Sequence, residues 1–474
     1  MSAVAVTVVM VAAGCTPTGT TTPQQCQYSP PPPTSPSAPA TVARPGRPTV
    51  GIASTDVVFK LADSSPAIDG VHLVDSTGVA LTGVNAALDA ANVSSLRTVF
   101  DDSAAPELGG YVRATTASFA AADALVATLA TRADVLDAYR AAEAAPPPAT
   151  PCFASHQKYF GGAPDGLGIQ AARTWPGATG ANVTVIDVEY SWNVSHEDLS
   201  AARKPNALLA QGIPVDPFSD DNHGTAVVGI LAGDPNAYGV NGIVPDATLH
   251  LVNASQLLNG YQPAVAIAAA AAALQPGDVI VLEQQNTGPN GELVPAEWVP
   301  EVYDAIVAAT AAGIIVVEAA GNGGVDLDDP TYGASFPSGK ADSGAIVVGA
   351  GAACGALPER SRMYFSDYGQ RVDVQAEGEC VASSGFGTLY SGGPNATYTD
   401  GFNGTSSATA LIGGVSAALS SAWQQERGTA PTPATIRNLL IASGVAQDSS
   451  ISAGHIGPRP NLSVALGLIA TWVE

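Results

Sequence analysis

The chain has 474 residues, a hydrophobic fraction of 46% and 50 glycines, which suits one large domain and a smaller one. It carries 42 acidic against 18 basic residues, a formal charge of −24. This acidic balance argues against nucleic acid and anionic membranes as partners and suits a soluble, exported protein.

The first 15 residues have the character of an export signal. An apolar run over 3–14 ends in Ala-Ala-Gly followed by Cys15, which resembles the signal of bacterial lipoproteins, in which the cysteine is lipidated. The usual positive segment is absent, because the first basic residue is Arg44. The alternative is an ordinary secretory signal in which Cys15 is incidental. Residues 16–50 are rich in Pro, Thr and Ser, which is typical of an extended linker.

Residues 51–150 differ in character from the linker before them. Helices are predicted over 84–91 and 119–129, and strands over 57–61, 95–100, 111–114 and 135–141. The resulting order, β-α-β-β-α-β, is that of a small ferredoxin-like α+β unit. The prolines at 146–148 interrupt this pattern, so a domain boundary is predicted near 145–155.

From residue 161 onward, apolar strands alternate with helices, which is typical of a parallel α/β sheet. The predicted strands are 183–187, 248–252, 279–283, 314–318 and 345–349. An alanine-rich stretch at 264–274 is too short to span a bilayer and is predicted to be a helix that covers the sheet. The helix after Pro433 and the apolar segment 462–472 are predicted to belong to the core.

Ser406 stands between a tight glycine turn and a helix almost without charge, predicted over about 406–418. A helix that is apolar on all sides is a buried one, and its free N-terminal amides favour negative charge. A nucleophile that generates an oxyanion benefits from this position. Taken alone, however, the motif is better explained as an ordinary serine N-cap.

Three further segments indicate a chemical role for Ser406. An apolar strand ends at Asp187, His223 opens another apolar helix, and Asn322 follows a third strand. A nucleophilic serine needs a base, the base needs an orienting carboxylate, and the oxyanion needs hydrogen-bond donors. Asp187 and Asn322 both fall at carboxyl ends of predicted strands, where open α/β sheets place their sites.

These segments resemble those of the subtilisin-like serine peptidases. Asp187 lies in the family's aspartate strand and His223 in its His-Gly-Thr motif. Asn322 lies in Ala-Ala-Gly-Asn and Ser406 in Gly-Thr-Ser-x-Ala, and the likeness extends over roughly 160–470. The resemblance implies a three-layer α/β fold with a mostly parallel sheet and helices on both faces. It also implies a serine endopeptidase that requires no cofactor for its chemistry.

The mechanism implied by the resemblance is acyl transfer. His223 takes the hydroxyl proton of Ser406, and Asp187 holds the imidazole in the required tautomer. The side-chain amide of Asn322 and the backbone N–H of Ser406 bind the oxyanion. The rival from another class is a non-catalytic binding protein on the same scaffold, and covalent labelling of Ser406 by a fluorophosphonate probe distinguishes the two.

The resemblance divides the chain into an export signal, a linker, a propeptide-like domain and a protease domain, at 1–15, 16–50, 51–150 and 151–474. Family propeptides assist folding and then occupy the active-site cleft. The chain is therefore expected to be a self-processing precursor, secreted or held outside the cytoplasm by a lipid anchor. Its expected partners are protein or peptide substrates and its own propeptide, with a first cut between about Glu143 and Ser155. The alternative for 51–150 is an independent binding module.

The chain departs from the family beside the expected substrate cleft. Glu283, Gln284 and Gln285 replace the small residues that commonly follow this strand, and they are expected to contact substrate. A carboxylate at Glu283 favours a basic residue before the scissile bond, unless Glu283 turns to solvent or pairs internally. Val188 and Glu189 replace the small residue and the glycine that commonly follow the aspartate.

The five cysteines include no CxxC pair, which argues against a zinc site. If Cys15 is lipidated, four cysteines remain and three pairings are open. A bridge between Cys354 and Cys380 is preferred because both lie in the protease domain.

Structural calcium is common in the family that the chain resembles. Asp326, Asp328 and Asp329 offer oxygen atoms of the kind that calcium prefers. The alternative is a solvated acidic loop without a metal ion.

Overall fold

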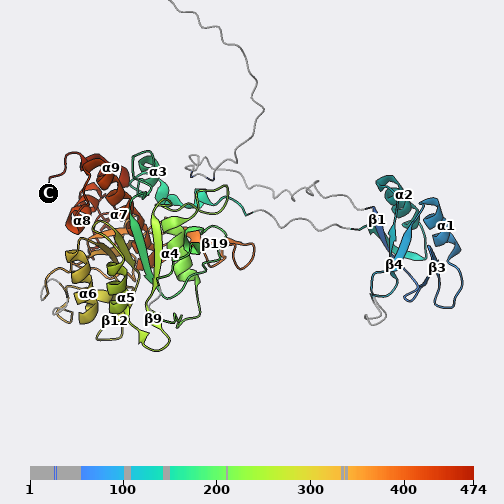
Figure 1. Ribbon diagram of the computed structural model, residues 1–474, viewed down its shortest axis with the longest axis horizontal. Coiled ribbons are helices and arrows are strands. Elements are labelled where there is room, and N and C mark those ends of the chain that lie inside the picture. Colours follow the sequence, from blue (N-terminus) through green and yellow to red (C-terminus); the bar gives the residue numbers. More distant parts are fainter. Residues whose placement is uncertain are drawn as a thin grey trace, which may run out of the picture. The chain divides into compact units, whose positions relative to one another are not determined.

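The computed structural model describes residues 26, 28, 55–100, 108–141, 150–209, 212–332, 336 and 340–473. The chain divides into two compact units, one made of Met1–Ser35 with Ala149–Glu474 and the other of Pro36–Pro148 (Figure 1). The predicted export signal with Cys15 and the proline break at 146–148 lie outside the described residues.

The smaller unit is an antiparallel sheet with two helices. The elements that follow the predicted order are β1 (Asp56–Leu61), α1 (Thr82–Ala90), β4 (Ser95–Thr98), β5 (Tyr111–Thr115), α2 (Phe119–Leu129) and β6 (Val135–Arg140). The strands lie in the order β4-β5-β1-β6, which is the ferredoxin-like arrangement expected from the sequence. A short hairpin of β2 (Ala67–Asp69) and β3 (His72–Val74) was not predicted, because three-residue strands show no periodicity.

The larger unit is built on a six-stranded sheet in which every neighbouring pair is parallel. In spatial order the strands are β16 (Val374–Glu377), β15 (Ile346–Gly351), β14 (Ile315–Ala319), β11 (Val279–Leu282), β7 (Thr184–Glu189) and β8 (Thr248–Asn253). Five of them match the predicted strands with shifted ends, whereas β16 was not predicted. Their apolar runs are buried on both faces, as expected for a parallel sheet covered by helices.

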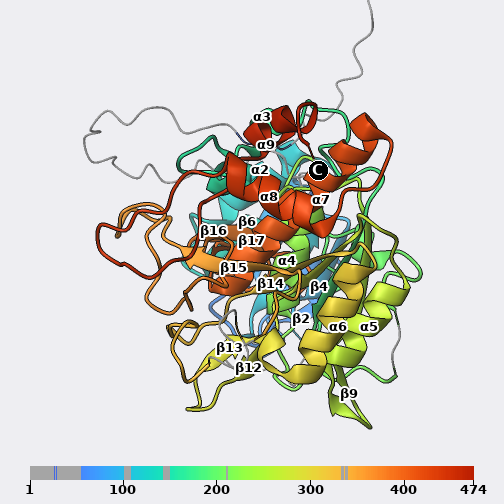
Figure 2. The same cartoon turned by 90° about the vertical axis from the view of Figure 1, so that its left-hand side faces the viewer.

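Helices cover both faces of this sheet. One face is covered by α5 (Pro263–Ala272) and α6 (Pro300–Ala311), which lie side by side in Figure 2. The other face packs against α4 (Asn222–Ala232) and α7 (Thr405–Arg427), with α8 (Pro433–Ser443) and α9 (Leu462–Ile469) beyond them. The unit therefore has the three layers expected from the sequence. Within the described residues, no helix has the length and apolarity needed to cross a bilayer.

Short elements fill the connections between these layers. The remaining helical segments are α3 (Ile169–Ala172) and four single 3₁₀ turns at Ala154–His156, Lys158–Phe160, Ala201–Arg203 and Ala296–Trp298. The remaining strands are β9 (Ser255–Gln256), β10 (Gly260–Tyr261), β12 (Gln285–Thr287), β13 (Leu293–Pro295), β17 (Val381–Ser384), β18 (Tyr390–Ser391) and β19 (Thr397–Phe402). The hairpin of β12 and β13 directly follows β11, so it stands beside the carboxyl end of the sheet.

Two disulfides tie the larger unit. Cys354 is joined to Cys380, and Cys26 is joined to Cys152. The backbone amide of Cys26 also donates to the carbonyl of Asn236 (2.6 Å), and Asn241 donates back to the carbonyl of Cys26 (3.0 Å). A residue from the stretch predicted to be a linker is thus part of this unit.

Candidate active site

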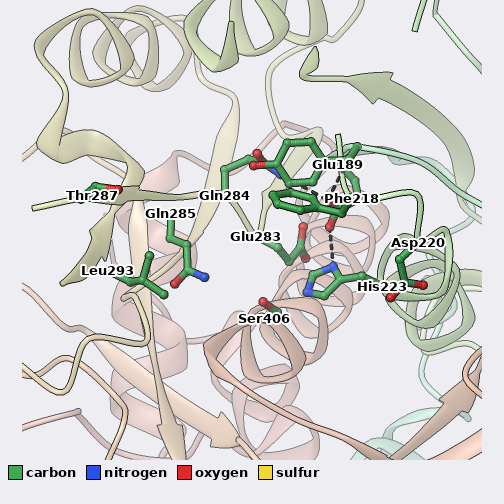
Figure 3. Close-up of a pocket in the computed structure, with 11 residues that line it drawn as sticks. Glu189, Phe218, Asp220, His223, Glu283, Gln284, Gln285, Thr287, Leu293 and Ser406 are labelled. Atoms are coloured by element: carbon green, nitrogen blue, oxygen red, sulfur yellow. Dashed lines mark hydrogen bonds and ion pairs between the residues drawn. The ribbon is translucent and has the colours of Figure 1, made fainter. Parts of the chain in front are cut away.

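The expected site residues gather where three neighbouring strands end and two helices begin. Glu189 is the last residue of β7, Glu283 follows β11, and Asn322 follows β14. His223 lies in the first turn of α4 and Ser406 in the first turn of α7. A cavity of about 430 Å³ opens between them and is lined by Glu189, His223, Glu283 and Ser406, among others (Figure 3).

Ser406 stands at the start of the longest helix of the larger unit. Residues 405–423 of α7 are all buried, so the predicted buried helix is present and runs further than expected. Gly404, with a positive φ of 95°, makes the sharp entry that a residue with a side chain would adopt only under strain. Ser406 is 5% exposed and faces the cavity, where the free amides of the helix N-terminus favour a developing negative charge.

The carboxylate that contacts His223 is Glu189. Nδ1 of His223 donates to Oε2 of Glu189 at 2.5 Å, which leaves Nε2 as the nitrogen free to accept a proton. The sequence prediction placed Asp187 in this position. Within the described part of the chain, Asp187 makes its hydrogen bonds to other residues, so the expected contact of Asp187 with His223 is replaced by that of Glu189.

The reason lies in where β7 ends. The strand was expected to stop at Asp187 but continues for two residues, to Glu189. Alternate residues of a strand share a face, so Asp187 and Glu189 both point toward α4 and α7, while Ile186 and Val188 pack on the opposite side. Glu189 lies one such step, about 7 Å, nearer the edge where the helices begin. Two carboxylates spaced by two residues at a strand end are the sequence signal that either of them could contact the histidine.

Glu189 is held by three donors. Its Oε1 accepts the backbone N–H of Tyr190 at 2.8 Å and the side-chain amide of Gln284 at 3.3 Å. Its Oε2 accepts from His223, so both oxygens are occupied and the carboxylate is fixed in orientation. Gln284, expected to contact substrate, therefore also positions the carboxylate behind the imidazole (Figure 3).

The pKa of His223 reflects this contact. Burial by itself disfavours the imidazolium, but the charge of Glu189 and its hydrogen bond outweigh burial, so the pKa of His223 is raised above its usual range. The side chain remains 38% exposed, which leaves its second nitrogen accessible from the cavity. A basic imidazole and a serine at a helix N-terminus, both on one cavity, are the combination expected of a nucleophile and its general base.

Asn322 presents its side-chain amide toward the same region. Its Oδ1 accepts the backbone N–H of Thr405 at 2.9 Å, which identifies Nδ2 as the free donor of the amide and holds it beside the start of α7. Nδ2 donates to Oε1 of Gln285 at 3.2 Å, and the backbone N–H of Asn322 donates to the same oxygen at 3.1 Å. The side-chain amide of Asn322, which was expected to bind the oxyanion, thus donates to the side-chain carbonyl oxygen of Gln285.

Asp187 and Glu283 lie behind the Glu189–His223 pair. Nε1 of Trp192 donates to Oδ2 of Asp187 at 2.6 Å. Val281 of β11 pairs with Asp187 of β7, so Glu283, two residues further on, lies on the same face of the sheet as Asp187. The two carboxyl groups are close enough to shift each other's pKa. Of the three possibilities stated for Glu283, this arrangement and its burial favour internal pairing over orientation toward solvent or an ion pair with a basic substrate.

Aromatic residues that the sequence analysis did not single out form one wall of the cavity. Tyr190 and Phe218 line it, and their rings meet edge to face with centroids 4.9 Å apart. Tyr261 from β10 contacts Tyr190 from the other side. Phe218 is 67% exposed, which is unusual for a phenylalanine and gives the cavity an apolar rim.

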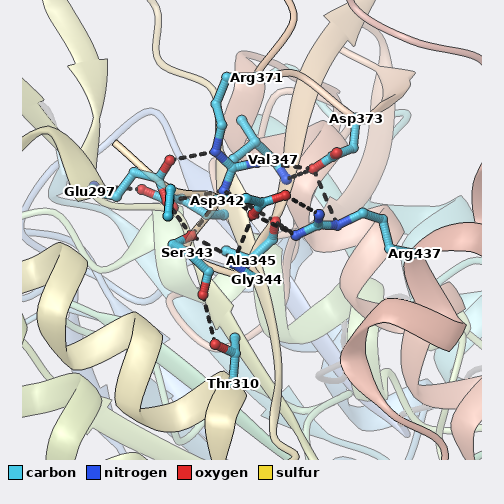
Figure 4. A network of polar contacts seen from close by, with 12 residues as sticks. Glu297, Thr310, Asp342, Ser343, Gly344, Ala345, Val347, Arg371, Asp373 and Arg437 are labelled. Carbon is cyan, nitrogen blue, oxygen red and sulfur yellow. Dashed lines mark hydrogen bonds and ion pairs between the residues drawn. The ribbon is translucent and has the colours of Figure 1, made fainter. Parts of the chain in front are cut away.

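A buried ion-pair network supports the strands on the Asn322 side of the sheet. The guanidinium of Arg371 contacts Glu297 through two hydrogen bonds of 2.6 and 3.0 Å and also donates to Asp373 at 3.1 Å (Figure 4). Arg437 from α8 pairs with Asp342 in the same network. These contacts join the segment that enters β15 to the start of α6 and to α8.

The three aspartates proposed for calcium do not converge. Asp326 accepts an amide of its own loop, Asp329 accepts that of Thr331, and Asp328 accepts the amide of Gln370. Among the described residues, the one group of three close metal-ligating side chains is Cys354, Glu379 and Cys380, and its cysteines form a disulfide. The aspartates therefore do not fit a calcium site, and structural calcium elsewhere stays a prediction.

The sequence profile described as "Subtilase family" matches residues 178–457, more than half of the chain. The chain belongs to the subtilase family. The match includes the segments of Glu189, His223, Asn322 and Ser406, so the site described above lies within the region shared with the family.

Curated relatives agree with this membership. The subtilase is 30% identical over 255 residues to subtilisin NAT of Bacillus subtilis subsp. natto, an alignment covering 51% of this chain and 56% of the relative. It is 30% identical over 273 residues to the major intracellular serine protease of Bacillus subtilis, covering 54% and 75% of the two chains. The subtilase therefore spans about half the length of the first of these relatives.

Solved structures similar to this subtilase include a protease from Pseudoalteromonas arctica, with 21% identity, a TM-score of 0.49 and coverage of 68% of this chain and 100% of that one. The patellamide maturation protease PatA is 23% identical with a TM-score of 0.45, and the match covers 62% of this chain and 98% of PatA.

Proposed function

We propose that this subtilase is a serine endopeptidase with Ser406 as nucleophile, His223 as base and Glu189 as the carboxylate that orients the base. The single observation that carries the proposal is the hydrogen bond between Glu189 and His223 on a cavity that Ser406 also lines. Membership in the subtilase family supports the reaction class.

The chemistry follows from this arrangement. Oγ of Ser406 attacks the carbonyl carbon of a peptide bond while Nε2 of His223 takes its proton. The tetrahedral oxyanion is stabilised by Nδ2 of Asn322 and by the N–H groups at the start of α7. The imidazolium then protonates the departing amine, and a water molecule hydrolyses the acyl-enzyme by the same steps in reverse. Glu189 remains ionised throughout and stabilises the imidazolium.

The substrate class we propose is an extended protein or peptide segment. The aromatic wall of Tyr190 and Phe218 offers apolar contact, and Asp220 adds an exposed carboxylate to the lining. Specificity for a basic residue through Glu283 remains a hypothesis that the contact of Glu283 with Asp187 does not favour. A peptide library that offers Lys, Leu and Phe before the scissile bond tests it, and equal cleavage after all three contradicts it.

We also propose that the smaller unit is a propeptide removed by the protease itself. Its ferredoxin-like order and its position before the protease support this role. The chain after the proposed cut is already integrated, because Gly239 donates to the carbonyl of Pro151 and accepts from the amide of Phe153, at 2.8 and 2.7 Å. The cut expected between Glu143 and Ser155 is therefore proposed to fall before Pro151.

The proposed location is outside the cytoplasm. The two disulfides support an oxidising compartment, and the signal-like residues 1–15 support export. Lipidation of Cys15 is the finer proposal. A Cys15→Ser variant expressed in a bacterial host should appear in the medium rather than in the membrane fraction, and a wild-type chain that incorporates no labelled fatty acid contradicts it.

The function is tested by a fluorophosphonate probe together with hydrolysis of a protein substrate. Wild-type protein should be labelled at Ser406 and should hydrolyse the substrate, whereas Ser406→Ala should do neither. His223→Ala should keep Ser406 but lose most of the labelling rate, because the hydroxyl then has no base. If folded wild-type protein that has been cleaved between residue 141 and Pro151 shows neither labelling nor hydrolysis, the chain is a binding protein on a subtilase scaffold.

A further inference from the structure

Three carboxyl groups lie close together behind the imidazole, and they are more than the proposed triad requires. Asp187, Glu189 and Glu283 are 0%, 2% and 4% exposed. The carboxylate oxygens of Glu189 accept hydrogen bonds from His223, Tyr190 and Gln284, and Glu189 has a role in the proposed triad. Asp187 and Glu283 have no such role in the reaction, so their presence together needs its own explanation.

The hydrogen bonds of these two residues are incomplete if both are ionised. Oδ2 of Asp187 accepts from Trp192, but Oδ1 of Asp187 and both carboxyl oxygens of Glu283 are buried, and none of the residues that the structure describes donates an N–H or hydroxyl to them. Buried carboxylate oxygens without a donor are costly, and two adjacent carboxylates repel each other. A single proton held between the two groups removes both costs, because it supplies the missing donor and cancels one charge.

We propose that Asp187 and Glu283 share one proton, and that this acid–carboxylate pair positions Glu189 and limits activity at alkaline pH. The proton resides mainly on Glu283, since Trp192 already stabilises the ionised form of Asp187. The pair is a positioning element that acts through Glu189. This inference rests on the proposed function for its effect on catalysis, although the shared proton itself does not depend on activity.

The electrostatics of the pocket agree with this assignment. Burial raises the pKa of Glu283 well above its usual range, and the charges of Asp187 and Glu189 raise it further. Burial also raises the pKa of Asp187, with Glu189 adding to the effect and Trp192 opposing it. Because the hydrogen bond from Trp192 favours the ionised form of Asp187, Glu283 is the group that keeps the proton.

The charged groups that face the pair come from each neighbouring element. Glu189 faces it from β7 and His223 from α4, with Asp220 acting on His223 from the loop before α4. Ser406 on α7 carries no charge. Burial raises the pKa of Tyr190 to about 12, so its hydroxyl stays neutral over the working range. Among these groups, His223 is thus the one that can carry a positive charge, and it pairs with Glu189.

Loss of the shared proton has a defined consequence. A third negative charge then appears in the buried cluster, where it repels Glu189 and disturbs the contact that orients His223. Activity should therefore fall as the pair is deprotonated at high pH. Glutamine at position 283 keeps the size and an N–H donor toward Asp187 but cannot ionise, so it should remove this loss.

The first test compares pH profiles of turnover for wild type, Glu283→Gln and Glu318→Gln. Glu318 is a matched control, because it is another buried acid with a raised pKa but contacts Glu297 instead of the site. We expect Glu283→Gln to move the alkaline midpoint upward by about one pH unit or more. Glu318→Gln should keep the wild-type midpoint. Superimposable profiles of wild type and Glu283→Gln overturn the proposal.

The second test detects the proton without activity. Infrared difference spectra of the Ser406→Ala chain at neutral pH should show a protonated carboxylic acid band that is lost in Ser406→Ala/Glu283→Gln. If the acid band is unchanged in the double variant, the proposal of a shared proton is wrong, even if the enzyme is active. Should Glu283→Gln fail to fold, ¹³C-glutamate labelling of the Ser406→Ala chain decides. A glutamate acid band that titrates with the wild-type alkaline loss supports the proposal, and any other result overturns it.

Discussion

Oε1 of Gln285 lies 3.2 Å from Nδ2 of Asn322 and 3.1 Å from its backbone nitrogen. The contact with Nδ2 is the one that a substrate oxyanion would make with the asparagine. In the free protein, a side chain of β12 thus occupies the donor that the reaction needs, and substrate must displace it. The hydrogen bonds of Asn322 to Thr405 keep the donor in place while this happens.

The first prediction is that Gln285→Ala accelerates labelling of Ser406 by a fluorophosphonate. Removing the competing acceptor should raise the rate about three- to tenfold, because one neutral hydrogen bond contributes about 1 kcal/mol net. Asn286→Ala is the matched control, since Asn286 on the same strand donates to Ala296 instead. A rate in Gln285→Ala at or below the wild-type value would show that Gln285 does not obstruct the donor.

The first prediction has a counterpart: Asn322→Ala should have the opposite effect. Loss of the side-chain donor should lower turnover about 100- to 1000-fold, the range known for the oxyanion asparagine of subtilisin. The variant also removes the acceptor of the Thr405 amide, so its thermal stability must be measured alongside. Full turnover in a folded Asn322→Ala protein would remove Asn322 from the oxyanion site.

The second prediction separates the two carboxylates of β7. Glu189→Gln should lower turnover about 10⁴-fold, the loss seen when a triad carboxylate becomes an amide. It should also move the acid limb of any residual activity to lower pH, because the charge that raises the pKa of His223 is gone. Asp187→Asn should cost far less. The reverse order of effects in the pH–rate profiles would restore Asp187 as the orienting residue.

The third prediction is that the protein is more stable in mild acid than at alkaline pH. Burial raises the pKa of Asp198 to about 8 and that of Asp367 to about 8. Between about pH 4 and pH 8 the folded state therefore binds more protons than the unfolded chain, whose carboxyls titrate near 4. The free energy of unfolding should fall as pH rises through this window. Urea titrations of Ser406→Ala should give a larger free energy of unfolding at pH 5 than at pH 8.

The fourth prediction concerns the network of Arg371. The side chains of Arg371 and Glu297 are 3% and 2% exposed, so Arg371→Met leaves a buried carboxylate without its partner. The free energy of unfolding should fall by about 3–5 kcal/mol. Arg437→Met is the comparison and should cost less. Its partner Asp342 is 51% exposed, and its other acceptors, Asp373 and the carbonyl of Ala345, still accept from Arg371. Equal losses in urea titrations would contradict the ranking.

The fifth prediction tests self-processing. Wild-type protein should give two fragments under reducing conditions, whereas Ser406→Ala should persist as one chain with the smaller unit attached. N-terminal sequencing of both, made in a host without other extracellular proteases, locates the cut. Processing of Ser406→Ala at the same bond would show that another enzyme makes it.

Much of the site could be predicted because its residues stand at the ends of strongly patterned elements. The apolar runs before Asn322 and after His223 and Ser406 leave little choice of fold, and the fold then brings the three together. The exception was the carboxylate that contacts His223, which was expected to be Asp187 and is Glu189 in the structure. An apolar run shows that a strand exists but not its last residue, and Val188 extends the run past Asp187 to Glu189. Pattern alone cannot choose between two acids on one face.

Contacts made by isolated side chains were beyond prediction for a related reason. Gln285 was expected near substrate, but nothing in its spacing indicates that its amide would meet Asn322. Cys26 lies in a proline-rich stretch whose composition suggests no partner, and its bond to Cys152 depends on where the folded unit places Asn236 and Asn241. Such contacts depend on three-dimensional proximity, which local pattern does not encode.

The bond between Cys26 and Cys152 joins residues 126 positions apart in the chain, and the loop it closes includes the whole of the smaller unit. A single cut between residue 141 and Cys152 opens this loop without separating its halves. The released end of the smaller unit stays at a high local concentration near the protease, and everything before Cys26 stays covalently attached as well. Full separation requires a second cut after Cys26 or a reductant. Before either event, the processed molecule weighs one water molecule more than its uncut precursor.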